Sequence, residues 1–259
     1  MQNLRVTLIQ SDLHWENPDA NRTMFSEKIK QVKGQTDLII LPEMFTTGFS
    51  MNASQLAETM DGATMKWFSQ QANYVNAVVT GSFIATENGE YFNRLIWMQP
   101  DGTFFIYDKK HLFTLAKEHQ TYCAGTQRLI VELNGWKICP LICYDLRFPV
   151  WSRNTEDYDL LIYTASWPVM RAEAWKSLLV GRAIENQSYT IGVNRVGVDG
   201  GGFEYSGDSS VIDYAGKRIY CTSNMEDVFT ASLNFVKQKT FRTKLNFLAD
   251  RDDFHFIEK

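Results

Sequence analysis

The stretch Trp136–Pro149, with the sequence WKICPLICYDLRFP, joins an apolar run to a turn that begins at a cysteine. The run up to Ile142 predicts a strand, and the preceding Asn134-Gly135 pair predicts a hairpin turn. Such a strand delivers Cys143 to its end, where the following backbone N–H groups can hold an oxyanion. Most free cysteines are small buried hydrophobes, so the rest of the chain must decide between a nucleophile and a core residue.

Further apolar runs on both sides of this stretch predict more strands and helices. Alternating strands and helices in the first half, followed by hairpins, predict an α/β fold with a mixed sheet. Pro140 cannot donate to a strand ladder, so we expect a bulge or a free edge beside it. The expected strands are residues 5–10, 38–41, 77–83, 91–98, 104–108, 129–133, 136–143, 160–164, 188–194, 209–213, 217–221 and 228–233, with helices over 17–34, 63–74 and 171–185. The tail from Phe241 onward shows no clear period.

Composition limits the class of protein. The 259 residues are 44% hydrophobic, and no Ser/Gly-rich or charge-rich run divides them, which predicts one domain over residues 1–259. A net charge of −4 without a large Lys/Arg cluster argues against a nucleic-acid partner. No apolar run is long enough to span a membrane and no signal core opens the chain, so we expect a cytoplasmic protein.

The cysteine and histidine patterns exclude other kinds of site. Four cysteines at irregular spacing do not predict a disulfide framework in a chain of this size, and we expect reduced thiols. The four histidines show no paired ligand spacing and no CxxC is present, so the sequence predicts no metal and no cofactor. A papain-like pair of Cys143 with His111 is conceivable, although no residue clearly orients that histidine.

Three expected strands end in residues of complementary chemistry. Glu43 follows the run 38–41, Lys109 follows the run 104–108, and Cys143 follows the run 136–142. Loops from one rim of a sheet converge in α/β proteins, so these side chains can meet. A glutamate can act as general base on the thiol while a lysine stabilises an oxyanion. A solvated ion pair and a core cysteine explain the same spacing equally well.

Three motifs resemble those of the nitrilase, or carbon–nitrogen hydrolase, superfamily: LPEM at 41–44, YDKKHLF at 107–113 and CYDLRFP at 143–149. They stand in the family's order, and the resemblance extends over nearly the whole chain. It implies a four-layer α-β-β-α sandwich with mixed sheets, which dimerises through helices near the cysteine. It also implies catalytic roles for Glu43, Lys109 and Cys143, with Lys109 selected over Lys110. Glu118 matches the family's second glutamate, which positions the lysine or the substrate.

Within the superfamily the chain most resembles the ω-amidase branch, which hydrolyses the terminal amide of 2-oxoglutaramate and related α-keto acid amides. The resemblance implies a small-molecule amide and water as substrates. Arg147 lies close enough to the nucleophile in sequence to bind a substrate carboxylate, or it forms a structural salt bridge instead. The backbone N–H of Tyr144 is expected to assist Lys109. We expect Trp167, Phe45 and the Tyr144 ring to wall the pocket. Nitrilase, carbamoylase, amide-forming synthase and a non-catalytic binding role remain alternatives.

Overall fold

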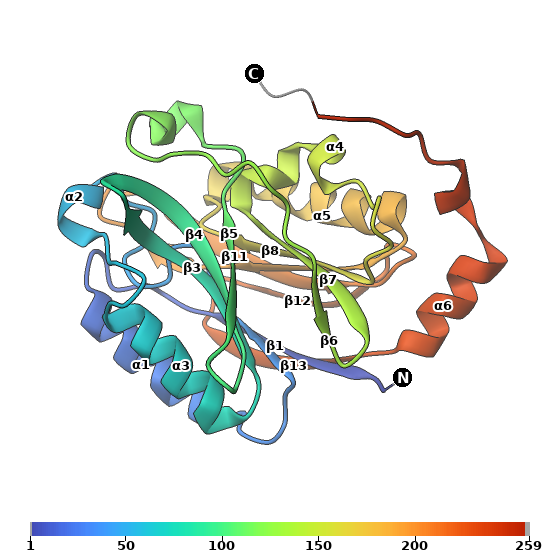
Figure 1. The fold of residues 1–259 in the computed structure, drawn as a ribbon, viewed down its shortest axis with the longest axis horizontal. Coiled ribbons are helices and arrows are strands. Elements are labelled where there is room, and N and C mark those ends of the chain that lie inside the picture. Colours follow the sequence, from blue (N-terminus) through green and yellow to red (C-terminus); the bar gives the residue numbers. More distant parts are fainter. Residues whose placement is uncertain (1, 257–259) are drawn as a thin grey trace.

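The computed structural model describes residues 2–256 (Figure 1). Thirteen strands are present in this range: β1 (Leu4–Gln10), β2 (Leu38–Ile40), β3 (Val78–Glu87), β4 (Glu90–Met98), β5 (Phe104–Asp108), β6 (Val131–Leu133), β7 (Trp136–Ile142), β8 (Leu160–Ala165), β9 (Tyr189–Asn194), β10 (Val196–Val198), β11 (Glu204–Ile212), β12 (Arg218–Ser223) and β13 (Asp227–Leu233). The α-helices are α1 (Pro18–Lys30), α2 (Ala53–Leu56), α3 (Ala63–Val75), α4 (Pro149–Ser152), α5 (Ala172–Asn186) and α6 (Phe235–Lys244).

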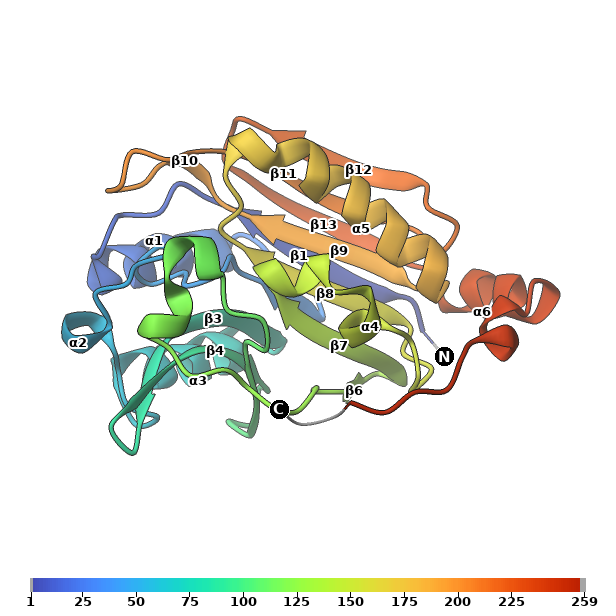
Figure 2. The same cartoon turned by 90° about the horizontal axis from the view of Figure 1, so that it is seen from above.

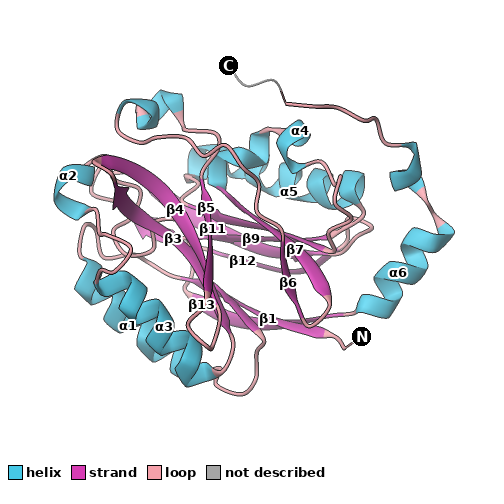
Figure 3. Ribbon diagram, in the orientation of Figure 1, coloured by secondary structure: helices cyan, strands magenta, loops and turns pink. Residues whose placement is uncertain are grey.

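The strands form two mixed sheets, as Figure 3 shows in magenta. The first has six strands in the order β13-β1-β2-β3-β4-β5, and its β1, β2 and β3 run parallel. The second has seven strands, in the order β10-β11-β9-β8-β7-β6 with β12 beside β11. Here β7, β8 and β9 run parallel, so their carboxyl ends reach the same edge. This confirms the expected mixed pairing.

Three buried clusters show that the sheets and helices are stacked as an α-β-β-α sandwich. Leu8, Ile40, Ile138 and Ile162 belong to an apolar cluster that joins the facing sides of the two sheets. On the outer side of the first sheet, α1 and α3 pack on strand residues, whereas α5 packs on the outer side of the second sheet. Figures 1 and 2 show these helix layers on opposite sides of the strands. The four-layer prediction is therefore confirmed.

The start of the first helix was predicted correctly, but its end was not. Asn17 accepts a bond from the Ala20 N–H at 3.1 Å and Pro18 occupies the first turn, as expected for a helix start. The helix ends at Lys30 rather than Gly34, because the next N–H groups bond to carbonyls three residues back and tighten the chain into turns.

Helix α6 lies where the sequence shows no apolar period. Gln238 is its one buried residue, and Asn234 caps its start by accepting from the Lys237 N–H at 2.8 Å. Most of its residues, including the buried one, are polar, which explains the missing apolar period. No helix among residues 2–256 has both the length and the apolar character that crossing a membrane requires.

Pro140 has the free edge that was expected. Strand β6 pairs only with Trp136 to Ile138 of β7, so it ends before Pro140. On the other side, Pro140 lies opposite Ile162 of the parallel strand β8. The missing N–H therefore costs no ladder bond to β6, and β7 continues straight to Cys143.

Candidate active site

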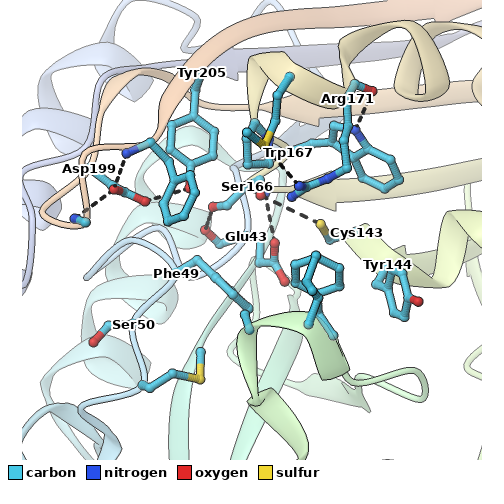
Figure 4. Close-up of a pocket in the computed structure, with 18 of the residues that line it drawn as sticks. Glu43, Phe49, Ser50, Cys143, Tyr144, Ser166, Trp167, Arg171, Asp199 and Tyr205 are labelled. Atoms are coloured by element: carbon cyan, nitrogen blue, oxygen red, sulfur yellow. Dashed lines mark hydrogen bonds between the residues drawn. The ribbon is translucent and has the colours of Figure 1, made fainter.

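The three predicted catalytic residues meet where strands of both sheets end. Glu43 follows β2, Lys109 follows β5, and Cys143 follows β7. Ser166, which comes directly after β8, also reaches this place. Figure 4 shows Glu43, Cys143 and Ser166 pointing toward one another in the centre of a pocket. The two sheets thus contribute different members of one cluster.

Glu43 is completely buried and each of its carboxylate oxygens accepts hydrogen bonds. Oε1 accepts from Lys109 Nζ at 2.8 Å and from Asn93 Nδ2 at 2.8 Å, and Oε2 accepts from the Ser166 N–H at 2.8 Å. A buried carboxylate requires such partners because it has lost its hydration. These bonds fix the orientation of Glu43.

Lys109 lies between two buried carboxylates. In addition to Glu43, its Nζ donates to Glu118 Oε1 at 3.1 Å and Oε2 at 2.9 Å. Burial lowers the pKa of Lys109, but Glu118 and Glu43 outweigh it, and the pKa is raised so that the amine stays charged. Burial also raises the pKa of Glu118, and the nearby Glu43 charge adds to that rise while Lys109 opposes it. The structure therefore places Glu118 against the lysine, and Lys110 lies outside this cluster.

Cys143 begins the short 3-10 helix η3 (Cys143–Arg147) with a φ of +42°. This left-handed conformation is uncommon outside glycine and costs about 1–3 kcal/mol, so the surrounding structure must enforce it. The thiol lies 4.0 Å from the Ser166 carbonyl oxygen. Burial raises the pKa of Cys143 well above its usual value, the Glu43 charge raises it further, and Lys109 acts in the opposite direction. The resting thiol is consequently protonated at neutral pH.

The turn after the cysteine is held by Asp145. Its carboxylate accepts from the Tyr107 hydroxyl at 2.7 Å and from the Ile142 N–H at 3.1 Å. It also bonds His111, at 3.0 Å through the backbone N–H and at 2.8 Å through Nδ1. The view that no residue orients His111 is therefore wrong. However, His111 stacks on Phe148 and does not line the cavity that contains Cys143, so a papain-like pair has no support.

A cavity of about 460 Å³ opens above the cluster. Its floor includes Glu43, Lys109 and Cys143, and Tyr144 and Trp167 form part of its walls as predicted. The remaining lining residues are largely aromatic or apolar and come mainly from loops: Trp15, Phe49, Ser50, Met51, Phe113, Leu115, Ala116, Arg147, Ser166, Pro168, Met170, Arg171, Asp199, Gly201, Phe203 and Tyr205.

Phe45 is not a wall of this cavity, and that prediction is wrong. Its side chain is fully buried behind the first sheet, where its ring contacts Phe25, Trp67 and Phe68 with centroid distances of 5.4, 5.1 and 5.2 Å. The chain turns directly after Glu43, so neighbouring side chains point in different directions. Phe49, four residues later, occupies the cavity instead.

Arg147 lines the cavity and makes no structural salt bridge among the described residues. The carboxylate of Asp145 is already used by the turn, and the Arg147 guanidinium lies 4.9 Å from the centre of the Trp167 ring. The structural salt bridge is therefore absent among the described residues, and binding of a substrate carboxylate by Arg147 stays a prediction.

Asn93, Ser166 and Arg171 were not predicted as site residues. Asn93 is a polar residue next to the mainly apolar second half of strand β4, and Ser166 stands directly after a buried strand, as Glu43 and Cys143 do. Both signals are weak in isolation. Among residues 2–256, no group of three or more His, Cys, Asp or Glu side chains is arranged to hold a metal ion.

Comparison with known proteins agrees with this fold and site. The sequence pattern of the family described as carbon-nitrogen hydrolase matches residues 5–242. Omega-amidase YafV of Escherichia coli (strain K12) is 44% identical over 257 residues, covering 98% of this chain and 99% of the relative. The 2-oxoglutaramate amidase of Bacillus subtilis (strain 168) is 30% identical over 250 residues, covering 95% and 96%.

A solved structure gives the same result. The CN-hydrolase superfamily protein XC1258 of Xanthomonas campestris, whose crystal structure contains an arsenic adduct in the active site, is 44% identical. It superimposes with a TM-score of 0.97 over 99% of this chain and 100% of that one. The chain belongs to the carbon–nitrogen hydrolase family, and its fold is the nitrilase-type sandwich.

Proposed function

We propose that this amidase hydrolyses the terminal amide of small α-keto acid monoamides such as 2-oxoglutaramate, through a thioester on Cys143. The observation that carries the proposal is the buried cluster of Cys143, Glu43 and Lys109 at the floor of a cavity that also contains Arg147, which has no ion pair among residues 2–256. The names of the E. coli and B. subtilis relatives support the same substrate class.

The first half-reaction begins with proton transfer from the thiol. Glu43 takes the proton of Cys143, and the thiolate attacks the amide carbon. The charged Lys109 amine, held by Glu43 and Glu118 at the floor of the cavity, stabilises the tetrahedral oxyanion electrostatically. The Tyr144 N–H is one of the first N–H groups of η3, which have no partner within the helix, and it supplies a second donor.

Breakdown of this intermediate releases ammonia and leaves the thioester. Glu43 returns its proton to the leaving nitrogen as the carbon–nitrogen bond breaks. Glu43 then removes a proton from water, which attacks the thioester carbon, and the thiolate leaves and is protonated again. Glu118 contacts Lys109 rather than the cavity, so we assign it the role of a positioning residue.

Arg147 is the proposed partner of the substrate carboxylate. Its guanidinium faces the cavity and lies on the Trp167 ring, which leaves its N–H donors available to a carboxylate. Trp167 is itself fixed by Asn194, whose Oδ1 accepts from the Trp167 N–H at 2.8 Å and whose Nδ2 donates to the Trp167 carbonyl at 3.0 Å. The aromatic support is therefore rigid.

A panel of substrates tests the proposed reaction. We expect ammonia release from 2-oxoglutaramate at a kcat/KM well above that for a simple aliphatic nitrile or an N-carbamoyl amino acid. A preferred nitrile would identify a nitrilase, and carbon dioxide released together with ammonia would identify a carbamoylase. Tight binding of the keto-amide without ammonia release would indicate a non-catalytic member of the fold.

The proposal extends to a homodimer in the cytoplasm. Val150 on α4 and Ile184 on α5 are apolar and 52% and 53% exposed, on helices that belong to the layer beside Cys143. Such exposed aliphatic side chains favour a contact between two copies through this layer. All four cysteines are free thiols, which favours a reducing compartment, and cell fractionation tests that location.

A further inference from the structure

A second arginine enters the cavity from the loop opposite Arg147. Arg171 ends the short 3-10 helix η4 (Val169–Arg171) between β8 and α5, and its guanidinium lies 5.1 Å from the centre of the Phe113 ring. Phe113 in turn packs on Tyr144, next to the nucleophile, with a centroid distance of 5.0 Å. Figure 4 shows the Arg171 side chain extending from its backbone into the pocket.

Each arginine packs on an aromatic ring from another loop: Arg147 on Trp167 after β8, and Arg171 on Phe113 after β5. Arg147 itself follows β7, whereas Arg171 follows β8. Each guanidinium thus lies over an aromatic ring rather than beside a carboxylate. Both arginines line the same cavity.

Neither guanidinium is neutralised within the described residues. The ion pairs of the described chain involve other arginines. Arg171 Nη1 donates only to the Met170 sulfur, at 3.3 Å, and a thioether is a weak acceptor.

The carboxylates that do line the cavity have other partners. Glu43 is bonded to Lys109, and Asp199 accepts from the Tyr205 hydroxyl at 2.7 Å and from two N–H groups of its own loop. Neither carboxylate pairs with Arg147 or Arg171, so both guanidinium groups are available to a ligand.

This charge distribution discriminates between substituents on the carbon next to the substrate carboxylate. Guanidinium groups have only donors, so they favour a carboxylate and an adjacent oxo oxygen, which are both acceptors. An ammonium group at the same carbon places a cation beside two guanidinium groups that have no ion pair among the described residues, and like charges that are shielded from water repel.

We propose that Arg171 is a specificity-determining residue that, together with Arg147, selects an α-keto acid amide over the corresponding α-amino acid amide. The inference rests on the proposed function, because it concerns the acyl substituents of the same substrate. Arg147 binds the substrate carboxylate. Arg171 binds the oxo oxygen on the adjacent carbon and repels an ammonium group at that carbon.

The test compares kcat/KM for three monoamides that differ only at this carbon: 2-oxoglutaramate, the monoamide of glutaric acid and glutamine. The variants are Arg171→Gln, which removes the charge, and Arg171→Lys, which keeps it. Arg218→Gln serves as the matched control, because Arg218 lies on β12 outside the cavity and is exposed. We expect wild type to prefer the keto-amide to glutamine. Arg171→Gln should lower that ratio about 10- to 100-fold, the range for loss of one charge-assisted bond.

Arg171→Lys should retain part of the preference, and Arg218→Gln should retain all of it. An equal loss on all three monoamides in Arg171→Gln would show that Arg171 only supports the packing of Phe113 and would overturn the inference. An unchanged ratio would overturn it as well. In both cases wild type would still hydrolyse 2-oxoglutaramate, whereas absence of that activity in folded wild-type protein would refute the proposed function itself.

Discussion

At the scale of single residues, the charge of Glu43 has two opposite effects on Cys143. As a base it accepts the thiol proton during the reaction, but as a neighbouring anion it raises the pKa of the resting thiol in addition to the effect of burial. The resting thiol is therefore harder to ionise than a free cysteine. This arrangement keeps a buried thiolate from forming without a reaction partner.

Replacement of Glu43 by Gln should separate these two effects. Turnover should be lost. The pKa of Cys143 should fall, because the negative charge of Glu43 no longer raises it while the positive charge of Lys109 still lowers it. Alkylation of Cys143 by iodoacetamide, followed by mass spectrometry across pH, should then reach half its maximal rate at a lower pH than in wild type.

The matched control for this experiment is Glu132→Gln, because Glu132 is an exposed residue of β6 outside the cavity. In this variant, alkylation of Cys143 should reach half its maximal rate at the same pH as in wild type. A Glu43→Gln profile at the wild-type position, or at higher pH, would show that the carboxylate does not act on the thiol in the resting enzyme.

The cluster of Glu43, Lys109 and Cys143 could be predicted because each residue follows an apolar run that marks a strand end and lies in a recognisable local motif. Their supporting partners could not. Asn93 reaches Glu43 only through the order of β2, β3 and β4 in the sheet, and Ser166 reaches it from the other sheet. Such contacts depend on strand order and sheet stacking, which sequence spacing does not contain.

At the scale of secondary-structure elements, Phe45 shows how a residue next to the site can serve the fold instead. Its ring joins the loop after β2 to α1 and α3 through an aromatic cluster. Aromatic character and closeness to Glu43 suggested a pocket wall, but the direction of a side chain after a strand end depends on the turn. The same lack of a local signal hid α6, whose surface is mostly polar.

The substitution Phe45→Leu tests this structural role. It should lower the free energy of unfolding by about 1–3 kcal/mol, because a buried ring is replaced by a smaller side chain. Urea denaturation measures this loss, and the KM for the amide substrate should stay near its wild-type value. A raised KM with an unchanged free energy of unfolding would show that Phe45 contacts the substrate and would contradict its structural role.

At the scale of the whole molecule, both sheets must stay together for the site to exist. Glu43 and Lys109 come from the first sheet, whereas Cys143 and Ser166 come from the second, and the apolar cluster between the sheets fixes their separation. The layers could be predicted from the resemblance and the alternation of elements, and the single domain over residues 1–259 stays a prediction. The proposed dimer adds a contact through α4 and α5.

A change on the α4–α5 surface tests that dimer. Ile184→Glu places a charge on an exposed apolar position of α5, so it should convert dimers to monomers. Light scattering after size-exclusion chromatography measures the mass, with Glu173→Gln on the exposed first turn of the same helix as control. A wild-type protein of monomeric mass would contradict the proposed assembly.

The most direct test of the central claim is ammonia release from 2-oxoglutaramate by wild type and Cys143→Ala, measured side by side. The substituted protein should keep its circular dichroism spectrum, because the change is small and the turn is held by Asp145. We predict strong release by wild type and none above background by Cys143→Ala. Equal release by both folded proteins would contradict a cysteine-dependent amidase.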